Sequence, residues 1–260
     1  MSGPVGVAGG EARPPYGGRV EIREEHRQRG YRVRLEWGAE GAALLAAECA
    51  VVVVVDVLSF CTSVDVAVGR GAAVLPQRYG DPAPAAAEAR ERGAVAAGDR
   101  HGAGPSLRPS SLLDLAPGTR IALPSPNGAT LCALAGAGAA EVVAGCLRNA
   151  PAVAAALRDV DGPVGLVPAG ERWRDGTLRV AWEDALGAGA IAAGLTGRSP
   201  EADAAAALFG ATPDLRAALE ALASGRELRA DGFGADVALA AEHGVSAAVP
   251  RRRADGFLAA

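Results

Sequence analysis

The most apolar stretch of the sequence ends in a carboxylate, and two hydroxyl groups follow it. Residues 51–63 read VVVVVDVLSFCTS, so Asp56 closes a run of five valines, and Ser59 and Thr62 come at the expected start of a helix. The first turn of a helix has free N–H groups and a positive dipole end, which suits an anionic ligand. A carboxylate that ends a buried strand is costly unless it is used. We interpret Asp56 as a metal ligand or general base; the alternative is that Asp56 and Ser59 only stabilise the helix start.

A glycine-rich loop carries a second group of reactive side chains. Residues 97–106 read AGDRHGAGPS and place Asp99, Arg100 and His101 side by side after an apolar segment. The Arg-His-Gly triplet resembles the signature of the histidine phosphatases, in which a histidine attacks phosphorus without a metal. His243, at the end of a helical run, is the candidate for the second histidine of such a site.

The chain has two asparagines, Asn127 and Asn149, and both stand in strand-to-helix connections. In residues 123–131, LPSPNGATL, the pair Asn127-Gly128 forms a tight turn and would place an amide on the same sheet edge as Asp56. Asn149 precedes a helix that starts near Pro151, where it could simply be a cap. The two amides are therefore candidates either for orienting a substrate or for shaping the connections.

Two adjacent acids, Glu183 and Asp184, open an alanine- and glycine-rich helix late in the chain. Acids are common in a first helical turn because the helix dipole stabilises them. As a pair they could equally hold Mg²⁺, which takes oxygen ligands and keeps water molecules for a substrate phosphate.

The composition narrows the chemistry, because all 26 basic residues are arginine. Without lysine there can be no Schiff base, no P-loop of the type GxxxxGK[ST] and no Ser-Lys nucleophile pair.

A formal charge of −4 and a pI near 5.5 argue against a partner that is a nucleic acid or a membrane surface. The run Arg251-Arg252-Arg253 is interpreted as a solvated tail. Four cysteines without metal-binding spacing, and no apolar run of about 18 residues, favour a cytoplasmic protein.

Apolar strand-like segments alternate with helical ones, which predicts an α/β fold with three α/β/α layers, a largely parallel or mixed central sheet and a single domain. Residues 1–18 are predicted to be a disordered tail and residues 19–260 one domain. Strands are expected at 32–37, 51–57, 73–76, 94–98, 120–123, 141–146, 164–168 and 245–249. Helices are expected at 62–68, 82–92, 129–135, 151–157, 183–195, 200–209, 213–223 and 235–243.

Taken in order, these segments resemble the 2-phosphosulfolactate phosphatase family over residues 47–250. The matching motifs are Asp56-Val57-Leu58, Gly98-Asp99-Arg100, Asn127-Gly128, Asn149-Ala150, Ala169-Gly170 through Glu183-Asp184, and Ser224-Gly225-Arg226-Glu227-Leu228 followed by Gly232 and Asp236. Each motif is short, but six in one order are far more specific than any one alone. The chain departs from the family where Ser59 replaces an arginine, Asp99 a glutamate, and His243 or Gly244 an aspartate, as in a divergent member of bacterial type.

The resemblance implies Mg²⁺-dependent hydrolysis of a small anionic phosphate ester such as 2-phosphosulfolactate, and a homodimer is compatible with it. It gives these roles: Mg²⁺ ligands Glu183 and Asp184; base or further metal ligand Asp56 or Asp99; phosphate-binding groups Arg100, Arg226 and the helix start at Ser59 and Thr62; orienting groups Asn127, Gly128 and Asn149. Arg100, Arg148 and Arg226 are the candidates to replace the missing arginine. The alternatives are a metal-independent histidine phosphatase using His101 and an anion-binding protein without activity.

Overall fold

The five-valine segment forms a strand that is buried on both faces. In the computed structural model, which describes residues 22–138 and 140–260, strand β2 (Val51–Val55) lies between β6 (Glu141–Gly145) and β7 (Val164–Pro168) and is parallel to both. Its side chains alternate between two hydrophobic cores, with Val52 and Val54 in one and the other three valines in the second. Burial on both faces is what a central parallel strand requires, so the valine run fixes the middle of the sheet.

The central sheet is mixed and has nine strands in the order β1-β7-β2-β6-β10-β11-β3-β5-β4. One group of parallel strands consists of β1 (Val33–Leu35), β7, β2 and β6, and the other of β3 (Ala73–Arg78), β5 (Arg120–Ser125) and β4 (Val95–Ala96). The antiparallel strands β10 (Arg251–Arg252) and β11 (Leu258–Ala259) join the two groups. A separate two-stranded hairpin is formed by β8 (Glu171–Arg172) and β9 (Leu178–Arg179).

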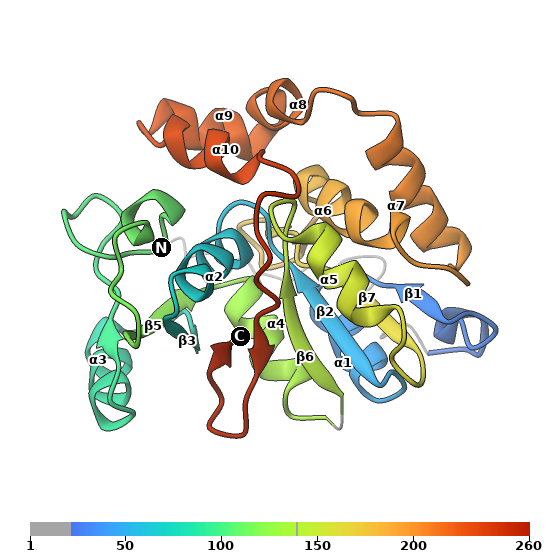
Figure 1. Cartoon of the computed structure of the whole chain (residues 1–260), viewed down its shortest axis with the longest axis horizontal. Helices are drawn as coiled ribbons and strands as arrows, with labels where there is room; N and C mark the ends of the chain where they lie inside the picture. The colour runs from blue at the N-terminus through green and yellow to red at the C-terminus, as the bar shows by residue number, and fades with distance from the viewer. Residues whose placement is uncertain (1–21, 139) are drawn as a thin grey trace, which may run out of the picture.

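Helices supply a layer on each side of β2 (Figure 1). Helices α1 (Gly38–Ala46), α2 (Phe60–Gly69) and α4 (Gly128–Ala135) share the core of Val52 and Val54. Helices α5 (Ala150–Leu157), α6 (Trp182–Ala193) and α7 (Pro200–Gly210) share the opposite core. Helix α3 (Pro82–Glu91) packs with β3 and β5 in a smaller cluster. The predicted α/β fold of a single domain, with a mixed sheet between helical layers, is confirmed.

Three short helices near the end of the chain form what we call the helical cap, residues 215–240. It consists of α8 (Leu215–Ala221), α9 (Ala223–Ala230) and α10 (Gly234–Ala240), and Figure 1 shows it at the top of the molecule in orange and red. A hydrogen bond of 2.8 Å from the Ser110 backbone N–H to the Asp236 carboxylate ties α10 to the short 3₁₀ helix η2 (Pro109–Leu112). The cap is thereby anchored to the loop region that follows β4.

Two of the expected elements are wrong. Residues 245–249 are not a strand but an irregular segment, although their largely apolar composition is compatible with a strand. The arginine run is not a solvated tail, because Arg251 and Arg252 form β10 inside the sheet, and Arg251 makes an ion pair of 2.6 Å with Glu141 of the neighbouring strand. The expected disordered tail, residues 1–18, lies outside the described residues. Within the part of the chain that is described, no helix is long and apolar enough to cross a membrane.

The contact between α6 and α7 depends on a glycine. A Cβ atom on Gly189 would overlap the backbone carbonyl oxygen of Ala205, which cannot move aside as a flexible side chain could. We expect Gly189→Ala to lower the free energy of unfolding by about 1–3 kcal/mol or more, as overpacking does. Gly210→Ala at the end of α7, where a Cβ meets nothing within 4 Å, is the matched control and should be neutral or slightly stabilising. Urea denaturation of both variants distinguishes the two positions.

Candidate active site

Four carboxyl groups gather at the ends of β2 and β7 and at the start of α6, and we call them the carboxylate cluster. They are Asp56, Glu171, Glu183 and Asp184, of which all but Glu171 are at most 5 % exposed. Burial first, and the neighbouring negative charges after it, raise the pKa of Asp56, Glu171 and Asp184. The carboxyl ends of parallel strands are where ligands of α/β folds bind, so this cluster is the natural candidate site.

Asp56 is fixed between the starts of two helices. Its Oδ1 atom accepts a hydrogen bond of 3.2 Å from the Phe60 N–H, and its Oδ2 atom accepts one of 2.8 Å from the Gly128 N–H. A Cβ on residue 128 would lie 2.6 Å from Oδ2 and 2.5 Å from the Phe60 ring, so only glycine permits this approach. Burial raises the pKa of Asp56 to about 6, against the opposing effect of these two N–H groups. Gly128 was predicted to bind substrate. In the structure its backbone N–H group holds the Asp56 side chain in place.

The two acids of α6 have different surroundings. Asp184 accepts backbone hydrogen bonds at both oxygens, from Val57 at 2.7 Å and from Gly170 at 2.9 Å. It therefore braces the turns after β2 and β7. Glu183 is just as buried, at 3 % exposed, yet no described group donates a hydrogen bond to its carboxylate. Of the two predicted metal ligands, Glu183 is the one with a carboxylate free for a ligand.

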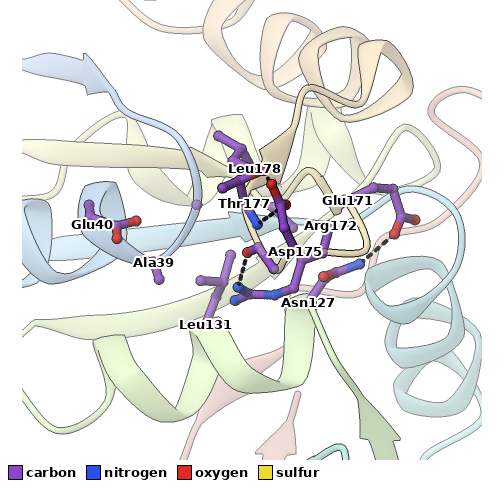
Figure 2. A pocket seen from close by; sticks show the side chains of 12 residues that line it. Ala39, Glu40, Asn127, Leu131, Glu171, Arg172, Asp175, Thr177 and Leu178 are labelled. Atoms are coloured by element: carbon purple, nitrogen blue, oxygen red, sulfur yellow. Dashed lines mark hydrogen bonds between the residues drawn. The ribbon is translucent and has the colours of Figure 1, made fainter. Parts of the chain in front are cut away.

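Glu171 was not among the residues chosen from the sequence. Its Oε2 atom accepts a hydrogen bond of 2.9 Å from the Asn127 amide, and Figure 2 shows the two side chains pointing toward each other. Burial, and then the charge of Asp56, raise the pKa of Glu171 to about 7. The available signal was its position, since it follows the buried strand β7 closely, as Asp56 follows β2. Asn127, which we predicted to orient the substrate, thus contacts a carboxyl group of the site.

A pocket opens beside Asn127 and Glu171. It has a volume of about 490 Å³ and lies between the start of α1 and the β8–β9 hairpin, as Figure 2 shows. Glu40 and Asp175 add negative charge to its wall, and Arg172 is the basic residue that lines it. Of the carboxylate cluster, Glu171 lines this pocket.

Arg100 brings a positive charge to the cluster from the loop after β4. Its guanidinium donates a hydrogen bond of 3.2 Å to the Ser59 hydroxyl, and its charge lowers the pKa of Asp56. Ser59 is the position at which the resemblance leads us to expect an arginine. The structure places the guanidinium of Arg100 against that same residue, whereas Arg148 lies elsewhere.

Three of the predicted substrate-binding residues have their polar atoms engaged within the fold. Thr62 is fully buried and donates to the Val57 carbonyl at 2.8 Å. Asn149 is fully buried and accepts at 2.9 Å from the Cys146 N–H, so it shapes the turn after β6. Arg148 forms ion pairs with Asp65 at 2.9 Å and with Glu242. None of the three contacts the carboxylate cluster.

Two other candidates are exposed. The carboxylate of Asp99 accepts a hydrogen bond of 2.8 Å from the His101 N–H within its own turn. The side chain of Arg226 projects from α9 and makes no hydrogen bond with a described residue. The structure therefore brings Asp56, Ser59, Arg100, Asn127, Gly128, Glu183 and Asp184 together, and leaves Asp99 and Arg226 outside this group.

The two histidines that a histidine phosphatase would use have separate aromatic partners. The ring of His101 packs on Phe233 of the cap at 5.0 Å, and that of His243 packs on Phe209 of α7 at 5.1 Å. Because the two histidines contact different aromatic rings and not each other, they do not form a paired site. Across residues 22–138 and 140–260, no group of three or more His, Cys, Asp or Glu side chains is arranged to hold a metal ion.

Removing the Asp184 carboxylate should destabilise the protein. Asp184→Ala leaves the N–H groups of Val57 and Gly170 buried without an acceptor, and each such group costs about 1–3 kcal/mol. We expect a loss of roughly 2–5 kcal/mol in chemical denaturation. Asp159→Ala, at an exposed turn with no side-chain hydrogen bond to a described residue, is the control and should change stability by less than about 0.5 kcal/mol. A small effect of Asp184→Ala would contradict the bracing role.

Glu171 should make stability depend on pH in the absence of metal. Its pKa is about 7 in the folded chain and near 4.5 in the unfolded chain. Between these values the unfolded chain has released a proton that the folded chain keeps, so the free energy of unfolding falls as pH rises from 4.5 to 7. Glu171→Gln removes up to roughly 2–3 kcal/mol of this fall. Urea denaturation in EDTA gives the free energy of unfolding of the wild-type protein and of Glu171→Gln at pH 5 and at pH 8. An equal change between the two pH values in both proteins would contradict the assignment.

The chain matches a known protein family over most of its length. The family model of 2-phosphosulpholactate phosphatase matches residues 42–255, which include every member of the carboxylate cluster and Arg100. No curated protein was found to match the sequence. The matched range extends from α1 into the segment between β10 and β11, so it covers both halves of the sheet and the helical cap. The chain therefore belongs to the 2-phosphosulpholactate phosphatase family.

Proposed function

We propose that the protein hydrolyses a small phosphate monoester, with 2-phosphosulfolactate as the first substrate to test. The observation that carries this proposal is the buried carboxylate cluster with the Arg100 guanidinium beside Asp56. Carboxylates supply proton transfer and metal ligands, and an arginine neutralises the phosphoryl oxygens. The family to which the chain belongs is one of phosphatases, which supports the same reaction.

Arg100 is proposed to bind the phosphoryl group. Its guanidinium is planar and has several N–H donors, of which the Ser59 hydroxyl takes one. The remaining donors suit the charged oxygens of a phosphate ester. The start of α2 lies directly after Ser59 and adds the positive end of a helix dipole. Of the three candidates to replace the missing arginine, Arg100, Arg148 and Arg226, we propose Arg100.

Proton transfer is proposed to involve Asp56 and Glu171. Asp56, whose pKa is about 6, is ionised at neutral pH and can accept a proton from the attacking water. Glu171, with a pKa of about 7, is partly protonated there and can donate to the ester oxygen. In the reaction, the water oxygen bonds to phosphorus as the phosphorus–ester oxygen bond breaks. The leaving oxygen takes the proton of Glu171, and Asn127 keeps the Glu171 side chain in place.

Mg²⁺ is the proposed cofactor, and the donor chemistry of the site fits it. Glu183 is a buried carboxylate with no described hydrogen-bond donor, and it lies among other carboxyl groups whose mutual repulsion a cation would relieve. Magnesium is often held by one or two carboxylates and otherwise by water and substrate phosphate, so it needs no larger group of ligands. Glu183 would be one ligand, and Asp56 or Asp184 the second. When bound, the ion would neutralise phosphoryl charge and position water.

Phosphatase assays with and without metal test the proposal. With Mg²⁺ we expect turnover of p-nitrophenyl phosphate or 2-phosphosulfolactate, and we expect EDTA to abolish it. Glu183→Ala should lower kcat by about 100-fold or more, and Arg100→Ala should raise KM about 10- to 100-fold. Asp159→Ala, at an exposed turn and without a side-chain hydrogen bond to a described residue, serves as the control.

Three outcomes would contradict parts of the proposal. Activity that survives EDTA, or that is unchanged in Glu183→Ala, contradicts the metal site. Activity lost in His101→Ala and indifferent to EDTA would indicate a histidine phosphatase instead. Phosphate binding in calorimetry without turnover of any ester would identify an anion-binding protein.

A further inference from the structure

A second arginine, Arg179, lies close to Glu171 of the carboxylate cluster. The charge of Arg100 lowers the pKa of Asp56, and the charge of Arg179 lowers the pKa of Glu171. Neither arginine forms an ion pair with any carboxylate in the described ranges. Two partly buried, unneutralised guanidinium groups therefore flank the cluster, one near each of its two proton-transfer candidates.

The surroundings of Arg179 differ from those of an ordinary hairpin arginine. Arg179 lies directly opposite Glu171 across the β8–β9 hairpin, where side chains of opposite charge commonly pair. Its guanidinium instead donates a hydrogen bond of 3.2 Å to the hydroxyl of Ser224, a buried residue of α9, and lies 5.9 Å from the Trp173 ring. The helical cap thus binds the guanidinium of Arg179 in place of Glu171. Most of the N–H donors of the guanidinium remain available for a ligand.

The cap also contacts Arg100. The ring of Phe233, in the turn between α9 and α10, lies 5.7 Å from the Arg100 guanidinium and 5.6 Å from that of Arg108. Phe233 is 6 % exposed, so its ring is a fixed surface against which Arg100 rests while it donates to Ser59. Such cation–π contacts favour one orientation of a long side chain.

We propose that Arg179 is a second substrate-binding arginine, and that Ser224 and Phe233 are positioning residues that hold Arg179 and Arg100 at the site. This inference rests on the proposed function, because the ligand of both arginines is the phosphate ester. A phosphoryl group presents several charged oxygens, and two planar guanidinium groups, one near Asp56 and one near Glu171, can bind different oxygens at once. One cap residue positions each arginine, so the cap sets the separation of the two cations.

The first test removes the guanidinium. Arg179→Ala should raise KM for p-nitrophenyl phosphate, and the Kd of inorganic phosphate in calorimetry, about 10- to 100-fold. Arg174→Ala is the matched control, since Arg174 is an exposed arginine of the same hairpin with no hydrogen bond to a described residue. It should change both quantities by less than about 2-fold, and melting temperatures of both variants check that folding is intact.

The second test separates positioning from simple packing. Ser224→Ala should raise KM about 3- to 10-fold with little change in kcat, Ser224→Thr should restore it, and Ser224→Ala should add nothing when Arg179 is already alanine. Phe233→Leu should likewise raise KM. Its control is Phe257→Leu, because Phe257 also packs against two arginines, Arg92 at 5.8 Å and Arg120 at 3.8 Å, but in the β10–β11 hairpin.

The outcomes distinguish this inference from the proposed function. An active wild-type protein in which Arg179→Ala behaves like Arg174→Ala overturns the inference alone. Additive effects of the Ser224 and Arg179 substitutions overturn the positioning role of Ser224. A wild-type protein that neither binds phosphate nor hydrolyses any ester overturns both. A wild-type protein that binds phosphate without turnover contradicts only the catalytic proposal, and a weaker Kd in Arg179→Ala then still supports the inference.

Discussion

Two buried aspartates that accept hydrogen bonds only from the backbone organise this site. Asp56 and Asp184 together bind four N–H groups, those of Val57, Phe60, Gly128 and Gly170, which belong to the turns after β2, β5 and β7. A carboxyl group is tolerated in the interior only when its oxygens have such hydrogen-bond partners. The hydrogen bonds therefore hold three strand ends and the starts of α2 and α4 in one arrangement. Glu171, Glu183 and Arg100 can face the same space because these turns are fixed.

Much of the fold could be predicted from local patterns. The valine run, the alternation of strands with helices and the polar residues at strand ends gave the layers of the fold and placed Asp56, Asn127 and Glu183 correctly at one sheet edge. The β10–β11 strands could not be found in this way, because two residues each carry no periodicity. They are strands only because the edges of β6 and β3 accept them. Arg251 was also predicted wrongly, to be solvated, because its partner Glu141 lies 110 residues away in the sequence.

The site was harder to predict, because residue type and position do not show where a side chain points. Asn127 and Asn149 have the same local context, yet one amide reaches Glu171 and the other bonds to its own turn. Arg100 and Arg148 both follow strands, but Arg148 faces the buried Asp65, and no local pattern indicates that the two residues pair. Glu171 and Arg179 were missed since both lie in a short hairpin whose contact with the helical cap is set by tertiary structure.

The hairpin in the middle of the sheet has a consequence for how the chain must fold during synthesis. Strands β10 and β11 are the last of the described strands to leave the ribosome, yet they join the two parallel groups, and Leu258, paired with Val74, is fully buried. Until they emerge, β6 and β3 each expose an edge with unpaired N–H and C=O groups, which is a template for association with other chains. The two halves of the sheet therefore cannot join until β10 and β11 have been synthesised. This stage of translation is when the protein most needs protection by a chaperone.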